Sequence, residues 1–86
     1  MNLDELRLRI DETDAAILPL FLRRLEIAHE IGEYKKANNL PVYDPEREAV
    51  KLNALTADLN EPQANNVREF FNRLFAVSRK AQEELL

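Results

Sequence analysis

Polar side chains stand at helix positions where the spacing of the surrounding apolar residues requires isoleucine or leucine. Arg24 is the clearest case, and Glu48, Ser78 and Gln82 interrupt two further apolar faces in the same way. An arginine in a buried face keeps its charge, so it needs an anion opposite it, and without one its desolvation costs several kcal/mol. Because buried polar groups have to be satisfied, these side chains are predicted to meet around one polar cavity or to pair with one another.

Two further cations give this set of side chains more positive than negative charge. Lys35 lies eleven residues after Arg24, nearly on the same side of a helix, and Arg47 directly precedes Glu48. In one interpretation Arg24 and Glu48 form a structural ion pair, Ser78 and Gln82 complete its hydrogen bonds, and the other two cations are solvated. In the other, three cations and one carboxylate line a cavity that binds a small dianion.

Arg7 has the right charge for the same ligand but the wrong position within one chain. It lies about 100° around the helix from Arg24 and roughly 25 Å along it. Arg7 therefore reaches such a cavity only if the cavity belongs to a second copy of the chain. The alternative is an exposed arginine near an acidic helix start.

The elements that have to position these residues are predicted to be helices. The chain contains one glycine and no alternating runs of valine or threonine. Apolar residues at steps of three and four predict a first helix over residues 3–38, a second over 45–59 and a third over 61–85. Asp44 and Asn60 are the expected N-caps of the second and third helices, and each is followed by a proline in the first turn.

The first helix has two features that affect its packing. Pro19 removes one backbone hydrogen bond, which costs ~3 kcal/mol unless the helix bends, but the apolar pattern keeps its phase across this residue. One kinked helix is therefore favoured over two separate ones. From Ala15 to Leu22 the helix is apolar around its whole circumference, which predicts burial on every side. Two short helices of the same chain are too little cover for that segment.

Composition excludes several classes of function. A single domain over residues 1–86 would bury only ~60% of its unfolded surface, which favours self-association. Without cysteine there are no disulfides or thiolate metal sites, and no metal or cofactor is expected. A net charge of −4, with acidic and basic residues interspersed, argues against nucleic-acid binding. The longest apolar run is far below the ~20 residues that span a bilayer, so a cytoplasmic protein without membrane contact is expected.

In these residues the sequence resembles the all-helical chorismate mutases. The resemblance covers nearly the whole chain and rests on Leu6-Arg7, Ile10-Asp11, Arg24 with Glu26-Ile27-Ala28, Ile31-Gly32, Lys35, the segment from Pro41 to Glu48, and Ser78-Arg79 with Gln82. It implies an intertwined homodimer of three-helix chains. Such a dimer would convert chorismate to prephenate in phenylalanine and tyrosine biosynthesis, with no cofactor.

The same resemblance implies a role for each polar residue. Arg24 and the partner chain's Arg7 are expected to bind the substrate carboxylates, Lys35 and Gln82 to contact its ether oxygen, and Glu48 to hold its ring hydroxyl. Asp44, Arg47 and Ser78 are expected to line the same pocket. A pericyclic rearrangement needs no nucleophile, metal or proton transfer, because orientation and charge stabilisation suffice.

Two alternatives stay open at this point. The isochorismate-pyruvate lyases resemble the mutases in fold and charged residues, and a non-catalytic helical dimer could serve as an adaptor. The chain could also associate with another shikimate-pathway enzyme. Pro19 departs from the family, whose first helix is usually aliphatic there, and a kink at this residue would shift Arg24.

Overall fold

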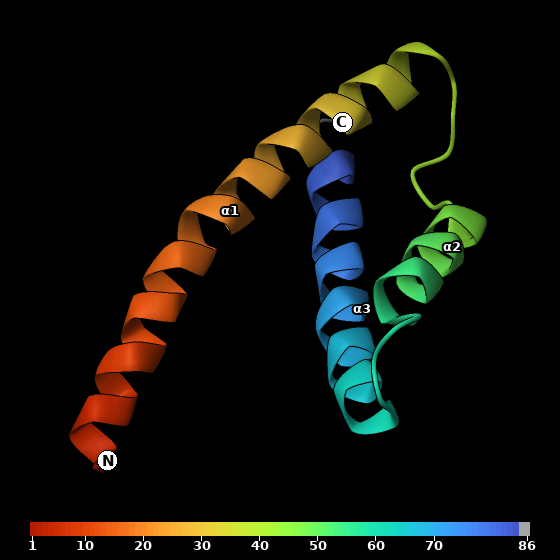
Figure 1. Ribbon diagram of the computed structural model, residues 1–86. Helices are drawn as coiled ribbons and strands as arrows, with labels where there is room; N and C mark the ends of the chain where they lie inside the picture. The colour runs from red at the N-terminus through yellow and green to blue at the C-terminus, as the bar shows by residue number, and fades with distance from the viewer. Residues whose placement is uncertain (85–86) are drawn as a thin grey trace.

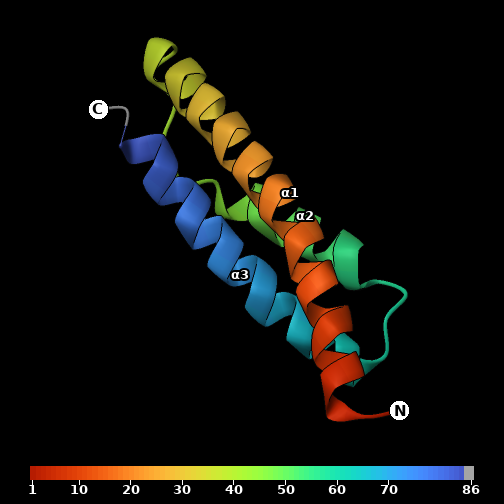
Figure 2. The ribbon, with the colours of Figure 1, turned by 90° about the vertical axis from the view of Figure 1, so that its left-hand side faces the viewer.

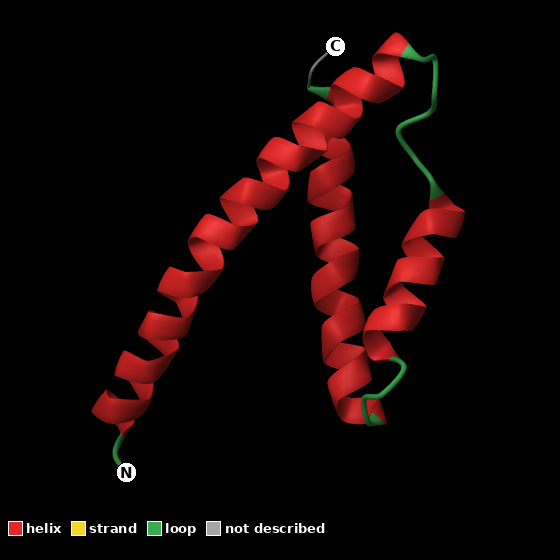
Figure 3. Ribbon diagram, turned by 45° about the horizontal axis from the view of Figure 1, so that its top comes forward, coloured by secondary structure: helices red, strands yellow, loops and turns green. Residues whose placement is uncertain are grey.

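The protein, described over residues 1–84 by a computed structural model, consists there of three α-helices without a β-strand. Helix α1 spans Leu3–Ala37, α2 spans Pro45–Thr56 and α3 spans Glu61–Glu83 (Figure 1, Figure 3). The predicted all-helical fold of three helices is confirmed. The expected end of the third helix at residue 85 lies outside the described residues.

Each helix begins at a polar side chain that accepts a backbone hydrogen bond. The accepting oxygens belong to Asn2, Asp44 and Asn60, and the donors are the backbone N–H groups of Glu5, Arg47 and Gln63, at 2.9, 3.0 and 2.9 Å. Such a bond satisfies one of the donors that a helix start leaves unpaired. The predicted N-caps of α2 and α3 are thus confirmed, and both helices carry proline in their first turn.

Helix α1 ends in a tight turn that reverses the direction of the chain. Asn38 is its C-cap, and Asn39 has a φ of 54°, a left-handed conformation that asparagine tolerates better than most residues. The N–H of Leu40 donates to the carbonyl of Lys35 at 2.8 Å, which closes the turn in the Schellman pattern. After this reversal, the segment before α2 runs back past the C-terminal end of α1.

Helix α2 ends at Thr56, three residues before the expected end at residue 59. The Thr56 hydroxyl donates to the carbonyl of Leu52 at 2.9 Å, and the N–H of Leu59 donates to the carbonyl of Thr56 at 3.1 Å. The chain thus leaves the helix in a turn while the apolar pattern still continues to Leu59. The predicted end of this helix at residue 59 is therefore wrong by three residues.

Pro19 lies inside α1 without dividing it. The helix is continuous from Leu3 to Ala37, and Figure 1 shows a single ribbon that curves gradually along its length. The prediction of one helix instead of two is confirmed. Because proline has no N–H, the carbonyl of Ala15 receives no hydrogen bond from the residue four positions on.

Helix α3 holds the other two helices together. It packs against both α1 and α2, which do not pack against each other, and the N-terminal half of α1 diverges from α3 (Figure 1). In Figure 2 α3 runs alongside the C-terminal half of α1, with α2 behind. The buried apolar side chains in residues 1–84 are those of Ala28, Ala64, Phe75 and Ala81. The core of one chain is therefore small.

The apolar centre of α1 is uncovered in the single chain. Ile17, Leu18, Leu20 and Leu22 are 45–63% exposed, which agrees with the expectation that the other two helices of the same chain are too little cover for this segment. The reason is geometric, since α2 does not pack against α1 and α3 diverges from the N-terminal half of α1 (Figure 3). Burial of the segment on every side stays a prediction that concerns a second chain. None of the helices within residues 1–84 is long and apolar enough to cross a membrane.

The overall dimensions are those of an open arrangement. The radius of gyration is 16.1 Å, compared with about 12 Å for a compact domain of this length. The accessible surface is 6938 Å², roughly 1,700 Å² more than a compact monomer of this mass exposes. The chain by itself leaves much apolar surface in water.

Candidate active site

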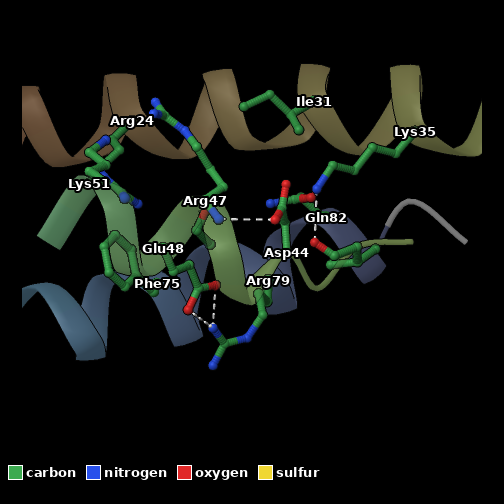
Figure 4. A pocket seen from close by; sticks show the side chains of 12 residues that line it. Arg24, Ile31, Lys35, Asp44, Arg47, Glu48, Lys51, Phe75, Arg79 and Gln82 are labelled. Atoms are coloured by element: carbon green, nitrogen blue, oxygen red, sulfur yellow. Dashed lines mark hydrogen bonds and ion pairs between the residues drawn. The ribbon is translucent and has the colours of Figure 1, made fainter. Parts of the chain in front are cut away.

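A pocket of about 400 Å³ lies between α1 and α2, with α3 as its floor (Figure 4). The side chains that line it are those of Arg24, Ile31, Lys35, Val42, Asp44, Arg47, Glu48, Lys51, Phe75, Ser78, Arg79 and Gln82. Seven of the eight residues predicted from the sequence are among them, and only Arg7 is not. Segments far apart in the chain thus contribute to one polar cavity.

Positive charge dominates this pocket. Five of its lining residues are cations, whereas only Asp44 and Glu48 carry negative charge. Two of these cations, Lys51 and Arg79, are not among the site residues that were predicted from the sequence. Each stands three residues from a predicted site residue, Lys51 after Glu48 and Arg79 before Gln82, so the helical spacing could have identified both. An excess of cations around a small cavity suits an anionic ligand.

Arg24 reaches the pocket from α1 without a carboxylate partner. Its Nη1 donates to the carbonyl of Leu74 at 3.4 Å, and neither of the two ion pairs in residues 1–84 involves it. Burial lowers the pKa of the Arg24 guanidinium, which nevertheless stays charged because its ordinary pKa is so high. The interpretation of Arg24 and Glu48 as an ion pair is wrong. Pro19, just over one turn earlier, does not remove Arg24 from the pocket.

Glu48 pairs with Arg79 of α3 instead. Nη1 of Arg79 lies 2.6 Å from Oε1 and 2.5 Å from Oε2 of the carboxylate (Figure 4). The guanidinium carbon also lies 4.9 Å from the ring centroid of Tyr43, within the range of a cation–π contact. Arg79 therefore joins α2, α3 and the segment that connects α1 to α2.

Lys35, Asp44 and Gln82 lie at one end of the pocket (Figure 4). Nζ of Lys35 donates to the carbonyl of Val42 at 2.9 Å, which leaves its other two hydrogens for a ligand. Gln82 is only 8% exposed, and its buried Oε1 has no hydrogen-bond partner within the described chain. Since buried polar atoms are normally paired, this oxygen is open to a donor group of a ligand in the pocket.

Arg24, Arg47 and Lys51 lie together at the opposite end (Figure 4). Burial lowers the pKa of the Lys51 ammonium, and the nearby charges of Arg24 and Arg47 lower it further. Three like charges in a partly buried place repel one another unless an anion lies between them. This end of the pocket is therefore suited to a carboxylate.

Arg7 is exposed in the first turns of α1, roughly 25 Å along that helix from Arg24. The single chain does not bring it to the pocket. Its predicted role depends on a second subunit.

The sequence profile of one protein family, described as Chorismate mutase type II, matches residues 6–83. Among curated proteins, the T-protein of Enterobacter agglomerans is 50% identical over 51 residues, which are 59% of this chain and 14% of that protein. The chorismate mutase of Methanocaldococcus jannaschii is 44% identical over 47 residues, 55% of this chain and 48% of that protein. The 4-amino-4-deoxychorismate mutase of Streptomyces pristinaespiralis is 47% identical over 45 residues, 52% of this chain and 35% of that protein. The chain thus spans less than half of each of these relatives.

Proposed function

The chain belongs to the chorismate mutase type II family, and we propose that it converts chorismate to prephenate in phenylalanine and tyrosine biosynthesis. The observation that carries the proposal is the pocket between α1 and α2, in which five cations face two carboxylates. Chorismate is a small dianion, so its two carboxylates suit this excess of positive charge. We propose the cytoplasm as the place of action, and another shikimate-pathway enzyme as a further partner.

The proposed mechanism uses orientation and charge without a covalent intermediate. Arg24, with Arg47 beside it, binds a substrate carboxylate and holds the side chain over the ring, because the reaction requires that folded conformer. The breaking C–O bond places negative charge on the ether oxygen, where Lys35 and Gln82 act as donors. Glu48 accepts a hydrogen bond from the ring hydroxyl. The two hydrogens that Lys35 does not donate to Val42 support its role as a donor.

We further propose that two chains form an intertwined homodimer. The exposed apolar centre of α1 and the roughly 1,700 Å² of surplus surface require cover, and interfaces that bury this much per partner are common in obligate dimers. In such a dimer Arg7 of the partner subunit would complete the pocket of its neighbour. The distance from Arg7 to Arg24 along one helix supports this arrangement.

An assay of chorismate consumption with prephenate detection tests the activity. Arg24→Ala is expected to lower kcat/KM by about a hundredfold, because one preorganised charge is lost. The exposed neighbour Arg23, which does not line the pocket, provides the matched control Arg23→Ala with near-normal activity.

Other outcomes of this assay separate the alternatives. Formation of salicylate and pyruvate from isochorismate, with no prephenate from chorismate, would identify a lyase. An adaptor would neither consume chorismate nor gain thermal stability from it, whereas a binding site raises Tm as ligand concentration rises. The amino analogue in the printed name of the Streptomyces relative is a further substrate to compare.

Replacing Lys51 with methionine is expected to change stability and binding in opposite directions. The lowered pKa of Lys51 means that the folded state disfavours its proton. This penalty is fully present at neutral pH and disappears as the pH rises through the lowered pKa to the unfolded value. Lys51→Met should therefore stabilise the ligand-free protein at neutral pH by no more than about 1 kcal/mol, since the side chain is only partly buried.

The same substitution should weaken chorismate binding about tenfold, because one cation that faces the ligand is lost. Thermal melts at neutral and alkaline pH and a KM measurement check both effects. Lys51→Arg keeps the charge and is the control. A Lys51→Met protein with lower stability and unchanged KM would contradict the prediction.

A further inference from the structure

Both carboxylates in the pocket are already engaged before a ligand enters. Glu48 is bound through both oxygens by Arg79, and Asp44 accepts the N–H of Arg47 as the N-cap of α2. Asp44 is also exposed, whereas Glu48 is partly buried. Within residues 1–84, Glu48 is thus the more buried of the two negative groups that a ligand in the pocket could meet.

Arg79 is held firmly enough to act as a permanent counter-charge. Its guanidinium lies over the Tyr43 ring at 4.9 Å while it binds Glu48, and both side chains of the ion pair are less than one-third exposed. A carboxylate offers about four acceptor positions, of which Arg79 occupies two. Glu48 therefore keeps the capacity to accept a hydrogen bond, but its charge is already balanced.

This difference between accepting a hydrogen bond and balancing a charge discriminates between two kinds of ligand group. A hydroxyl donates one hydrogen bond and brings no charge, so the paired carboxylate can satisfy it. An ammonium group needs a carboxylate of its own, and here it would enter a pocket that also contains four other cations. Like charges at close range are strongly disfavoured.

We propose that Arg79 is a specificity-determining residue, which makes the pocket select a hydroxyl over an amino group at the ring position that faces Glu48. The inference rests on the proposed mutase function and on the Glu48–Arg79 ion pair. Arg79 excludes the amino substrate without touching the reacting bonds. The amino analogue is the molecule in which NH₂ replaces the ring hydroxyl of chorismate, and it is protonated at neutral pH.

The test compares kcat/KM for chorismate and for this analogue in three proteins. The wild type is expected to prefer chorismate by about a hundredfold or more. Arg79→Gln, which keeps a polar side chain and removes the charge, should move the ratio toward the amino substrate by about tenfold or more. Arg79→Lys retains a cation next to Glu48 and should keep a ratio close to that of the wild type.

A role of Arg79 in folding alone would lower activity on both substrates equally and leave the ratio unchanged, and that result would overturn the inference. An equal shift of the ratio in Arg79→Gln and Arg79→Lys would overturn it as well. A wild-type protein that converts chorismate and its amino analogue equally well would contradict only this inference. A wild-type protein that converts neither substrate would contradict both the proposed function and this inference.

Discussion

Replacing Gln82 with glutamate is expected to lower the rate of prephenate formation at neutral pH by on the order of a thousandfold, and to restore much of it in acid. The amide of glutamine donates a hydrogen bond at any ordinary pH, whereas a glutamate donates only when it is protonated. An ionised glutamate would also place negative charge next to the ether oxygen, where negative charge develops. Loss of one donor alone typically costs a hundredfold to a thousandfold.

The measurement is kcat across a pH range for the wild type, Gln82→Glu and Gln82→Met. Methionine has nearly the same shape as glutamine without the donor, so Gln82→Met should be slow at every pH. Acid should rescue only the glutamate variant. An unchanged pH profile in Gln82→Glu would remove Gln82 from the ether contact.

Mixing two nearly inactive variants is expected to regenerate about a quarter of the wild-type activity if Arg7 acts across a symmetric dimer. Arg7→Ala and Arg24→Ala should each retain only about one hundredth of the wild-type activity as homodimers. With random exchange, about half of the dimers contain one chain of each kind, and one of the two sites in such a dimer has both arginines. The other site lacks both.

A matched mixture provides the control for this experiment. Arg24 and Lys35 line the pocket of the same chain, so mixed dimers of Arg24→Ala and Lys35→Ala contain one defect in each site and should not recover. Heterodimer formation has to be verified separately, for example by mass spectrometry. Absence of recovery in verified Arg7→Ala and Arg24→Ala heterodimers would contradict a site shared between subunits.

Helical periodicity predicted the features that depend on local sequence. It located three helices and two N-caps, and it selected the residues on α1, α2 and α3 that the structure brings to one pocket. The helices and the pocket residues follow from which face of a helix a side chain occupies, and the N-caps follow from the residue types at the helix starts. The continuity of α1 through Pro19 was predictable for the same reason, because the apolar pattern keeps its phase there.

Features that depend on contacts between helices could not be predicted in this way. One interpretation of the sequence paired Glu48 with Arg24, but the packing of α2 against α3 brings Arg79 to Glu48 instead. Periodicity does not specify which helices pack together, so it did not indicate Arg79 as the partner of Glu48. The end of α2 at Thr56 is a further feature that side-chain spacing did not predict.

The position of α3 has a consequence for the order in which the molecule forms. Helices α1 and α2 do not pack against each other, and both depend on α3, which follows them in the chain. While a ribosome is still synthesising α3, the two helices that carry most of the cations have nothing to hold them in place. The pocket therefore cannot form before α3 has been synthesised.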